Sequence, residues 1–184
     1  MKKFQSLIAF SAFSFSACSG DVVESYRAAK EDSPAAAPAA PSQAAGPRDL
    51  SWDAPAGWTR LPVSGMRVAS FGVGGRAELS VVALPGEAGG VLANVNRWRG
   101  QLGLAGVDQG GLDAQTRRIA SGAGELLFFD IRGKAQADGT SRLAVAVLST
   151  AEQTWFFKLA GPDEAVARAL ASFQVFLRSL RRAG

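Results

Sequence analysis

Apolar and polar residues alternate along the middle of the chain in the pattern of half-buried strands. Met66 to Phe71 and Ala77 to Leu84 both carry apolar side chains largely at every second position. The stretch Gly72-Val73-Gly74-Gly75 between them is typical of a tight turn, so we predict a β-hairpin. Further strands are predicted at Thr116 to Ala120, Glu125 to Arg132, Arg142 to Thr150 and Thr154 to Leu159, with a turn at Asp138-Gly139.

Two other segments have the period of amphipathic helices. The first is predicted to begin at Gly89-Gly90 and to end near Leu102, and the second to run from Gly161-Pro162 to about Arg181. The apolar faces are Val91, Val95, Trp98 and Leu102 in the first helix, and Val166, Leu170, Phe173, Leu177 and Leu180 in the second. The glycine-rich stretch from Gly103 to Gly111 is predicted to be a loop.

The order of these elements indicates the fold class. Two strands precede the first helix, and three or four strands separate it from the last helix. Neighbouring strands joined by short turns favour antiparallel pairing, and each helix needs a sheet face on which to bury its apolar side. We therefore predict an α+β domain in which helices flank an antiparallel sheet.

Residues 1–17 are typical of a secretory signal peptide. Lys2 and Lys3 form a basic start, Phe4 to Phe15 is mostly apolar, and two small residues precede Cys18. An apolar stretch of about a dozen residues is shorter than the roughly 20 that a membrane-spanning helix needs. The ending Phe15-Ser16-Ala17-Cys18 resembles a bacterial lipobox. That resemblance implies lipidation of Cys18 and a membrane anchor, and the alternative is a plain signal peptide followed by a chance cysteine.

Residues 18–49 are predicted to be a tether that holds the folded part away from the lipid surface. Ser33 to Pro41 consists of small residues and repeated prolines, which keep a chain extended and build no core. A single globular domain is expected over residues 50–184. Ser19, rather than an aspartate, follows Cys18, so the lipobox resemblance implies an outer-membrane location facing the periplasm.

Composition excludes several classes of chemistry. The chain has no histidine and one cysteine, which excludes a Ser-His-Asp triad and an intrachain disulfide. Asp108, Asp113, Glu125 and Asp130 lack the spacing of a metal-binding loop. Loss of the two N-terminal lysines would lower the net charge from +4 to +2, which is too balanced to indicate a nucleic-acid partner. We expect no cofactor, no metal and no enzymatic activity, although a paired-carboxylate glycosidase stays open.

The element order and two sequence stretches resemble the PsbP/Mog-like fold, an antiparallel sheet between helices. The stretches are Pro55-Ala56-Gly57-Trp58 and the run from Trp155 to Pro162, and the last helix, which ends with Phe173 to Leu180, matches too. The resemblance implies an α/β/α sandwich, and members of that fold are mainly accessory or binding proteins. A second resemblance is to a group of bacterial lipoproteins with a PGxAGGxxANVNRWRxQxGL stretch, which here runs from Pro85 to Leu104.

Within that stretch the first predicted helix carries a cluster of polar residues. They are Asn94, Asn96, Arg97, Arg99 and Gln101. At about 100° per residue, Asn94, Arg97 and Gln101 project together beside the apolar face. Amides and a guanidinium on one ridge could recognise a carboxylate, a phosphate or a peptide backbone. The alternative is structural, because a solvated helix face also carries such residues and an asparagine can tie down an adjacent loop.

Two functions from different classes are therefore open. The first is a non-catalytic accessory module that docks on a protein complex in the cell envelope. The second is a carrier that binds a small anionic ligand or a peptide through the ridge from Asn94 to Gln101. An apolar, well-formed pocket beside the ridge would favour the carrier, and a flat polar surface would favour docking.

Overall fold

The structure is a computed structural model in which residues 49–136 and 139–183 are described. Several predicted features lie outside these residues: the signal peptide, Cys18, the tether up to residue 48, and Asp138 of the predicted turn. Lipidation and the tether therefore stay predictions, and the fold is that of the part from Asp49 onward.

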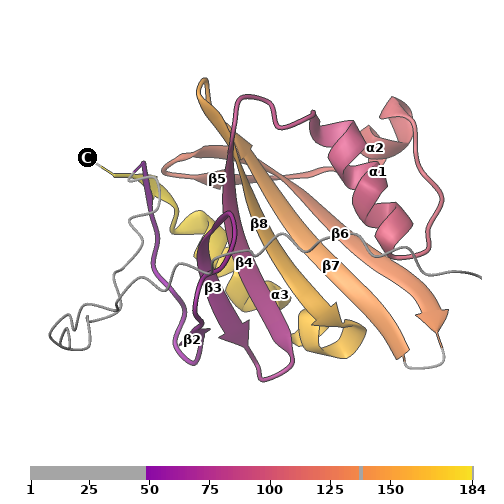
Figure 1. Cartoon of the computed structure of the whole chain (residues 1–184), viewed down its shortest axis with the longest axis horizontal. Coiled ribbons are helices and arrows are strands. Elements are labelled where there is room, and N and C mark those ends of the chain that lie inside the picture. The colour runs from indigo at the N-terminus through magenta and orange to yellow at the C-terminus, as the bar shows by residue number, and fades with distance from the viewer. Residues whose placement is uncertain (1–48, 137–138, 184) are drawn as a thin grey trace, which may run out of the picture. The chain divides into compact units, whose positions relative to one another are not determined.

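Seven antiparallel strands form the main sheet, in the order β2-β3-β4-β8-β7-β6-β5 (Figure 1). Their bounds are Thr59–Arg60 (β2), Arg67–Val73 (β3), Ala77–Pro85 (β4), Arg117–Ser121 (β5), Gly124–Gln136 (β6), Gly139–Ser149 (β7) and Gln153–Pro162 (β8). The predicted hairpin is β3–β4, whose turn contains Gly74 and Gly75, both with positive φ. β6, β7 and β8 are longer than predicted, because backbone pairing with a neighbour continues past the alternating stretches.

Helix α3 (Asp163–Arg178) covers one face of the sheet. Val166, Phe173 and Phe176 of this helix are each 0% exposed, and they pack with Phe128 of β6 and Phe157 of β8. Alternate residues of each strand point to this face, so the period-two pattern of the sequence supplies one half of the core. The apolar face predicted for the last helix is confirmed.

The end of α3 differs from the prediction of a helix to about Arg181. The helix ends at Arg178, Leu180 is 0% exposed, and Arg181–Arg182 form the short strand β9. β9 pairs with β1 (Leu50–Ser51), so the chain leaves the helix about one turn early. Strand pairing and the burial of Leu180 outweigh local helix propensity there.

Helices α1 (Val91–Gln101) and α2 (Gln109–Gln115) cover the opposite face of the sheet on its β6–β7 side (Figure 1). The predicted apolar stripe of α1 is confirmed, because Val95 and Trp98 are buried and Val91 and Leu102 pack partly buried beside them. These residues form a second core with strands β6, β7 and β8. Among the described residues, this second core includes none from β3. Helices α1 and α2 therefore bury less of this sheet face at its β3 end.

The prediction of a loop from Gly103 to Gly111 is wrong in its second part, where α2 begins. The Asp108 carboxylate accepts a hydrogen bond of 2.8 Å from the Gly111 N–H and caps the helix. Leu112 is 5% exposed and packs into the second core. Because glycine disfavours helices, the cap and this tertiary contact decide the local structure.

The layers confirm the predicted fold class, an α+β domain with helices on both faces of an antiparallel sheet. In residues 49–136 and 139–183, no helix is both long and apolar enough to cross a membrane.

Candidate functional site

Helix α1 carries all five residues of the predicted cluster, and the structure divides them between its two flanks. Val95 and Trp98 fix the helix on the sheet, so the residues beside them have defined directions. Asn94 and Arg97 are hydrogen-bonded to each other on one flank. Asn96 and Arg99 lie on the other flank, toward the loop that leads to α2.

Asn94 is buried, with 2% of its surface exposed, and its amide is fully used. The Nδ2 group donates to the carbonyl oxygens of Ala88 at 2.8 Å and Gly90 at 2.7 Å, and Oδ1 accepts from the Arg97 guanidinium. Ala88 has a φ of 49°, which is strained for a residue with a side chain. Asn94 therefore holds the loop before α1 and orients Arg97, which is the structural role left open by the sequence.

Replacing Asn94 with alanine should lower the free energy of unfolding by about 1–3 kcal/mol, because the part-buried carbonyl oxygen of Ala88 loses its donor and that of Gly90 keeps only the backbone N–H of residue 94. Urea unfolding of the purified protein measures this loss. Arg97→Gln is the matched control, since it leaves both loop hydrogen bonds of Asn94 in place. Equal stabilities of Asn94→Ala and the control would show that the amide does not hold the loop.

Asn96 and Arg99 hold the segment between α1 and α2. Asn96 exchanges two hydrogen bonds with the backbone of Val107, at 2.9 Å and 2.8 Å. Arg99 donates to the Ala105 carbonyl oxygen at 2.8 Å and to the Gln115 side chain at 3.0 Å. These contacts occupy both side chains within the domain, so Arg97 and Gln101 are the members of the predicted cluster that remain exposed.

A cation that the sequence analysis did not select, Lys158, lies near Arg97. Lys158 of β8 points to the same sheet face as α1, and its Nζ lies 5.8 Å from the centre of the Trp98 ring. Arg67 of β3 also lies near Lys158 and pairs with Glu78. We call Arg67, Arg97 and Lys158 the basic cluster. No ion pair joins Arg97 or Lys158 to any acidic residue within the described part of the chain.

The strand register places hydroxyl groups next to this cluster. Ser80 of β4 is directly opposite Lys158, and Ser70 of β3 is directly opposite Ser80. All three side chains point to the sheet face that carries α1. Ser70 also accepts a hydrogen bond of 3.2 Å from the Arg67 guanidinium. Ser70 is 0% exposed, so the partly exposed Ser80 is the hydroxyl that lies beside Lys158, and this pair is suited to an oxyanion.

The environment of Lys158 disfavours its positive charge. Its pKa is lowered from the usual value, first because burial removes water from the ammonium group and then because Arg97 and Arg67 are positively charged neighbours. A half-buried cation that has like-charged neighbours and no acidic partner costs stability. This arrangement marks Lys158 as a candidate binding residue.

Replacing Lys158 with methionine should stabilise the domain near neutral pH and flatten its stability profile at alkaline pH. Between the lowered pKa in the folded state and the usual 10.5, the unfolded chain binds more protons than the folded one. The stability of the parent protein must therefore rise with pH across that window, and the variant lacks this gain. Urea unfolding at several alkaline pH values measures both curves, with exposed Lys134→Met as the control. Parallel curves for the parent and Lys158→Met would contradict the prediction.

A polar hollow of about 820 Å³ adjoins the basic cluster where β7 and β8 meet the start of α3. Lys158 and Gln101 both line it, so the hollow begins at the exposed end of the α1 flank. Five cationic side chains and two acidic ones line its wall: Arg76, Arg132, Arg142, Lys158, Arg168, Asp163 and Glu164. The sequence signal for this site was a lysine in the apolar strand Trp155-Phe156-Phe157-Lys158-Leu159.

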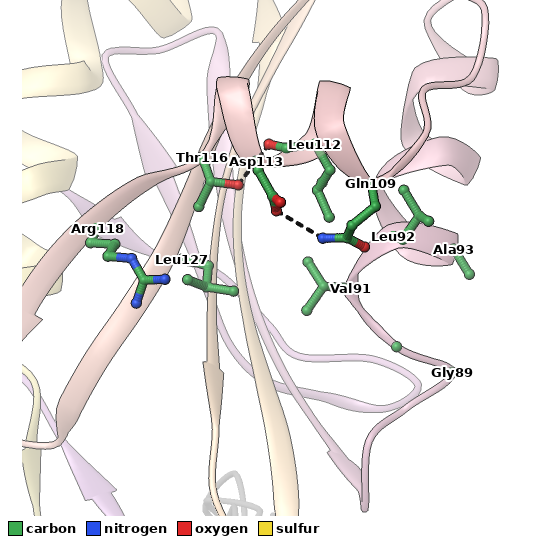
Figure 2. A pocket seen from close by; sticks show the side chains of 11 residues that line it. Gly89, Val91, Leu92, Ala93, Gln109, Leu112, Asp113, Thr116, Arg118 and Leu127 are labelled. Atoms are coloured by element: carbon green, nitrogen blue, oxygen red, sulfur yellow. Dashed lines mark hydrogen bonds between the residues drawn. The ribbon is translucent and has the colours of Figure 1, made fainter.

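An apolar pocket of about 610 Å³ lies on the other side of α1 (Figure 2). Val91 and Leu92 of α1, Leu112 of α2 and Leu127 of β6 contribute its apolar wall. The polar side chains at this pocket are already bonded, with Gln109 donating to Asp113 at 2.8 Å and the Thr116 hydroxyl to the Leu112 carbonyl oxygen at 2.8 Å. None of the five predicted cluster residues lines this pocket.

No protein-family model matches the chain, and a comparison with curated proteins gives no match. Among solved structures, a crystal structure from Bacteroides thetaiotaomicron is similar to it with a TM-score of 0.47 and 9% identity, over 73% of this chain and 45% of that one. LpqN, a protein of Mycobacterium tuberculosis involved in cell envelope biogenesis, is similar with a TM-score of 0.45 and 12% identity, over 73% of this chain and 83% of LpqN. This chain therefore spans less than half the length of the Bacteroides protein.

Proposed function

We propose that this chain is an envelope-anchored lipoprotein that acts as a non-catalytic binding module, docking on an acidic surface of a membrane or periplasmic protein complex. Lipidation at Cys18 would hold it on the outer membrane, and the tether would let the domain reach its partner. The resemblance to the PsbP/Mog-like fold, whose members are mainly accessory or binding proteins, agrees with this role.

The basic cluster is the observation that carries the proposal. Arg97 and Lys158 come from different elements, lie close together, and have no acidic partner in the described residues. Complementary charge steers association and selects partners that carry the opposite sign. An acidic protein surface would relieve the repulsion that the free domain carries at this position.

The distribution of the pockets favours docking over the carrier hypothesis. A carrier that used the α1 ridge would have its apolar pocket beside Arg97 and Gln101, whereas the apolar pocket lies on the opposite flank. The hollow that does adjoin Gln101 is lined mainly by charged and polar groups. Such a surface resembles the polar, solvated rim of a protein interface more than a small-molecule pocket.

The anchor can be tested separately from the docking surface. Replacing Cys18 with serine should leave an unlipidated precursor, because serine cannot form the thioether that carries the lipid. Metabolic labelling with a radioactive fatty acid in the producing bacterium reports on this modification. Equal labelling of the parent protein and Cys18→Ser would exclude Cys18 as the lipidation site.

Site-specific cross-linking in intact cells tests the docking surface. A photoreactive amino acid in place of Gln101 should give a cross-linked species of defined mass, since Gln101 is exposed beside the basic cluster. The matched control position is Val175, which is 59% exposed on α3. The proposal requires a product from position 101 and none from position 175. Equal products from both positions, or no product from position 101, would overturn it.

A further inference from the structure

The hollow next to the basic cluster contains charges that its own acidic residues do not neutralise. Arg142 bonds to Asp163 at 3.1 Å, and Arg132 pairs with the same carboxylate at 2.7 Å, so these two arginines have a partner. Arg168 is 3.7 Å from Glu164, with both side chains largely exposed. Among the described residues, Arg76 and Lys158 form no ion pair.

Close packing brings Arg76 to the hollow. Arg76 lies in the turn between β3 and β4, and its carbonyl oxygen would be 2.8 Å from a Cβ atom on Gly161. Only glycine at position 161 lets the turn approach the end of β8 this closely. The turn therefore sets Arg76 at the far end of the hollow, while Lys158 lies at the end that faces Arg97.

Lys158 belongs to both the basic cluster and the hollow, which together form one surface where cationic side chains outnumber acidic ones. The acidic side chains along it are Glu78, which pairs with Arg67, and Asp163 and Glu164 in the wall of the hollow. From Lys158 to Pro162 the strand advances about 13 Å at the usual rise of roughly 3.3 Å per residue. A single small anion would neutralise one end of such a surface and leave the other end unchanged. The surface fits an elongated occupant with several negative charges.

We propose that the basic cluster and the hollow together bind an extended acidic segment of a partner protein, about four to six residues long. This inference rests on the proposed docking function and names the part of the partner that is recognised. Carboxylates of the segment lie against Arg97, Lys158 and Arg76, and its backbone amides meet the Gln101 side chain and the Ser80 hydroxyl. Complementary charge supplies recognition, as in other acidic-motif readers.

Fluorescence anisotropy with a dye-labelled hexaglutamate peptide tests this inference on the full chain in detergent. We expect binding that weakens as salt is added. Lys158→Met and Arg76→Ser should each weaken it by about tenfold. Exposed Arg178→Ala on α3 is the matched charge control and should bind as the parent does. A labelled hexaglutamine peptide should not bind.

Three results would overturn the inference. They are no binding of hexaglutamate, binding unaffected by Arg76→Ser, and full displacement of the peptide by inorganic phosphate at equal charge concentration. The second would restrict the site to the basic cluster, and the third would identify a small oxyanion as its ligand. The proposed docking function is tested by a different experiment, the cross-link from position 101 in cells, so the two proposals can be rejected independently. A retained cross-link without peptide binding would leave docking intact and remove only the acidic segment.

Discussion

Trp98→Ala is expected to lower the free energy of unfolding by about 3–5 kcal/mol, the usual cost of truncating a large buried aromatic side chain. Trp98 is 2% exposed, and its ring meets the ring of Phe156 edge-on at 5.9 Å. It is the largest side chain of the second core, and α1 contributes to this core mainly through Val95 and Trp98. A loss of this size approaches the whole stability of an ordinary domain.

Urea unfolding followed by circular dichroism measures this loss, and Arg97→Gln is the matched control on the next residue. Arg97 is exposed, so its replacement by another hydrogen-bond donor should change stability by less than about 1 kcal/mol. A cost below about 1 kcal/mol for Trp98→Ala would mean that α1 is not fixed on the sheet by this residue. The geometry of the basic cluster, which depends on α1, would then lose its support.

Arg142→Met is expected to cost about 1.5–3 kcal/mol, because Asp130 and Asp163 lose charge-assisted hydrogen bonds from a shared cation. Arg117 remains 3.5 Å from Asp130 and Arg132 remains 2.7 Å from Asp163, so neither carboxylate is left without a cation. The Arg142 guanidinium makes two hydrogen bonds of 2.7 Å to Asp130 and one of 3.1 Å to Asp163. Both aspartates have side chains that are 16% exposed. The pKa of Arg142 is raised, chiefly by its hydrogen bond to Asp130.

The contrast with an exposed ion pair makes this prediction specific. Arg118 pairs with Glu125, but their side chains are 67% and 53% exposed, so Arg118→Met should cost less than about 1 kcal/mol. Thermal and urea unfolding of both variants give the comparison. Equal losses in the free energy of unfolding for Arg142→Met and Arg118→Met would show that the ion pairs joining β6 and β7 to the start of α3 contribute little to stability.

Local patterns in the sequence predicted most of the fold. Alternation identified strands β3 to β8 within a few residues, and the spacing of Val91, Val95 and Trp98 identified both α1 and its buried face. The misjudged segments depend on contacts that are distant in sequence. α2 forms because Leu112 reaches the second core, and α3 stops early because β9 pairs with β1.

The candidate site was only partly predictable. The helical period placed Asn94 and Arg97 together. It could not show that the Asn94 amide is already hydrogen-bonded to the carbonyl oxygens of Ala88 and Gly90. Lys158 is 61 positions beyond Arg97, and only the packing of α1 on β8 brings the two together. Which strands neighbour each other, and in which register, is a property of the folded sheet that period-two patterning leaves open.

The central claim is that Arg97 and Lys158 serve binding at the expense of stability, and a double variant tests it most directly. Arg97→Gln/Lys158→Met removes both charges and keeps a donor at position 97 and an apolar side chain over Trp98. The thermal midpoint and the yield of the cross-link from position 101 are measured on the same variant. We predict a midpoint at or above that of the parent, together with loss of the cross-link. A midpoint lowered by about 3 °C or more, or a cross-link at the parent's yield, would contradict the claim.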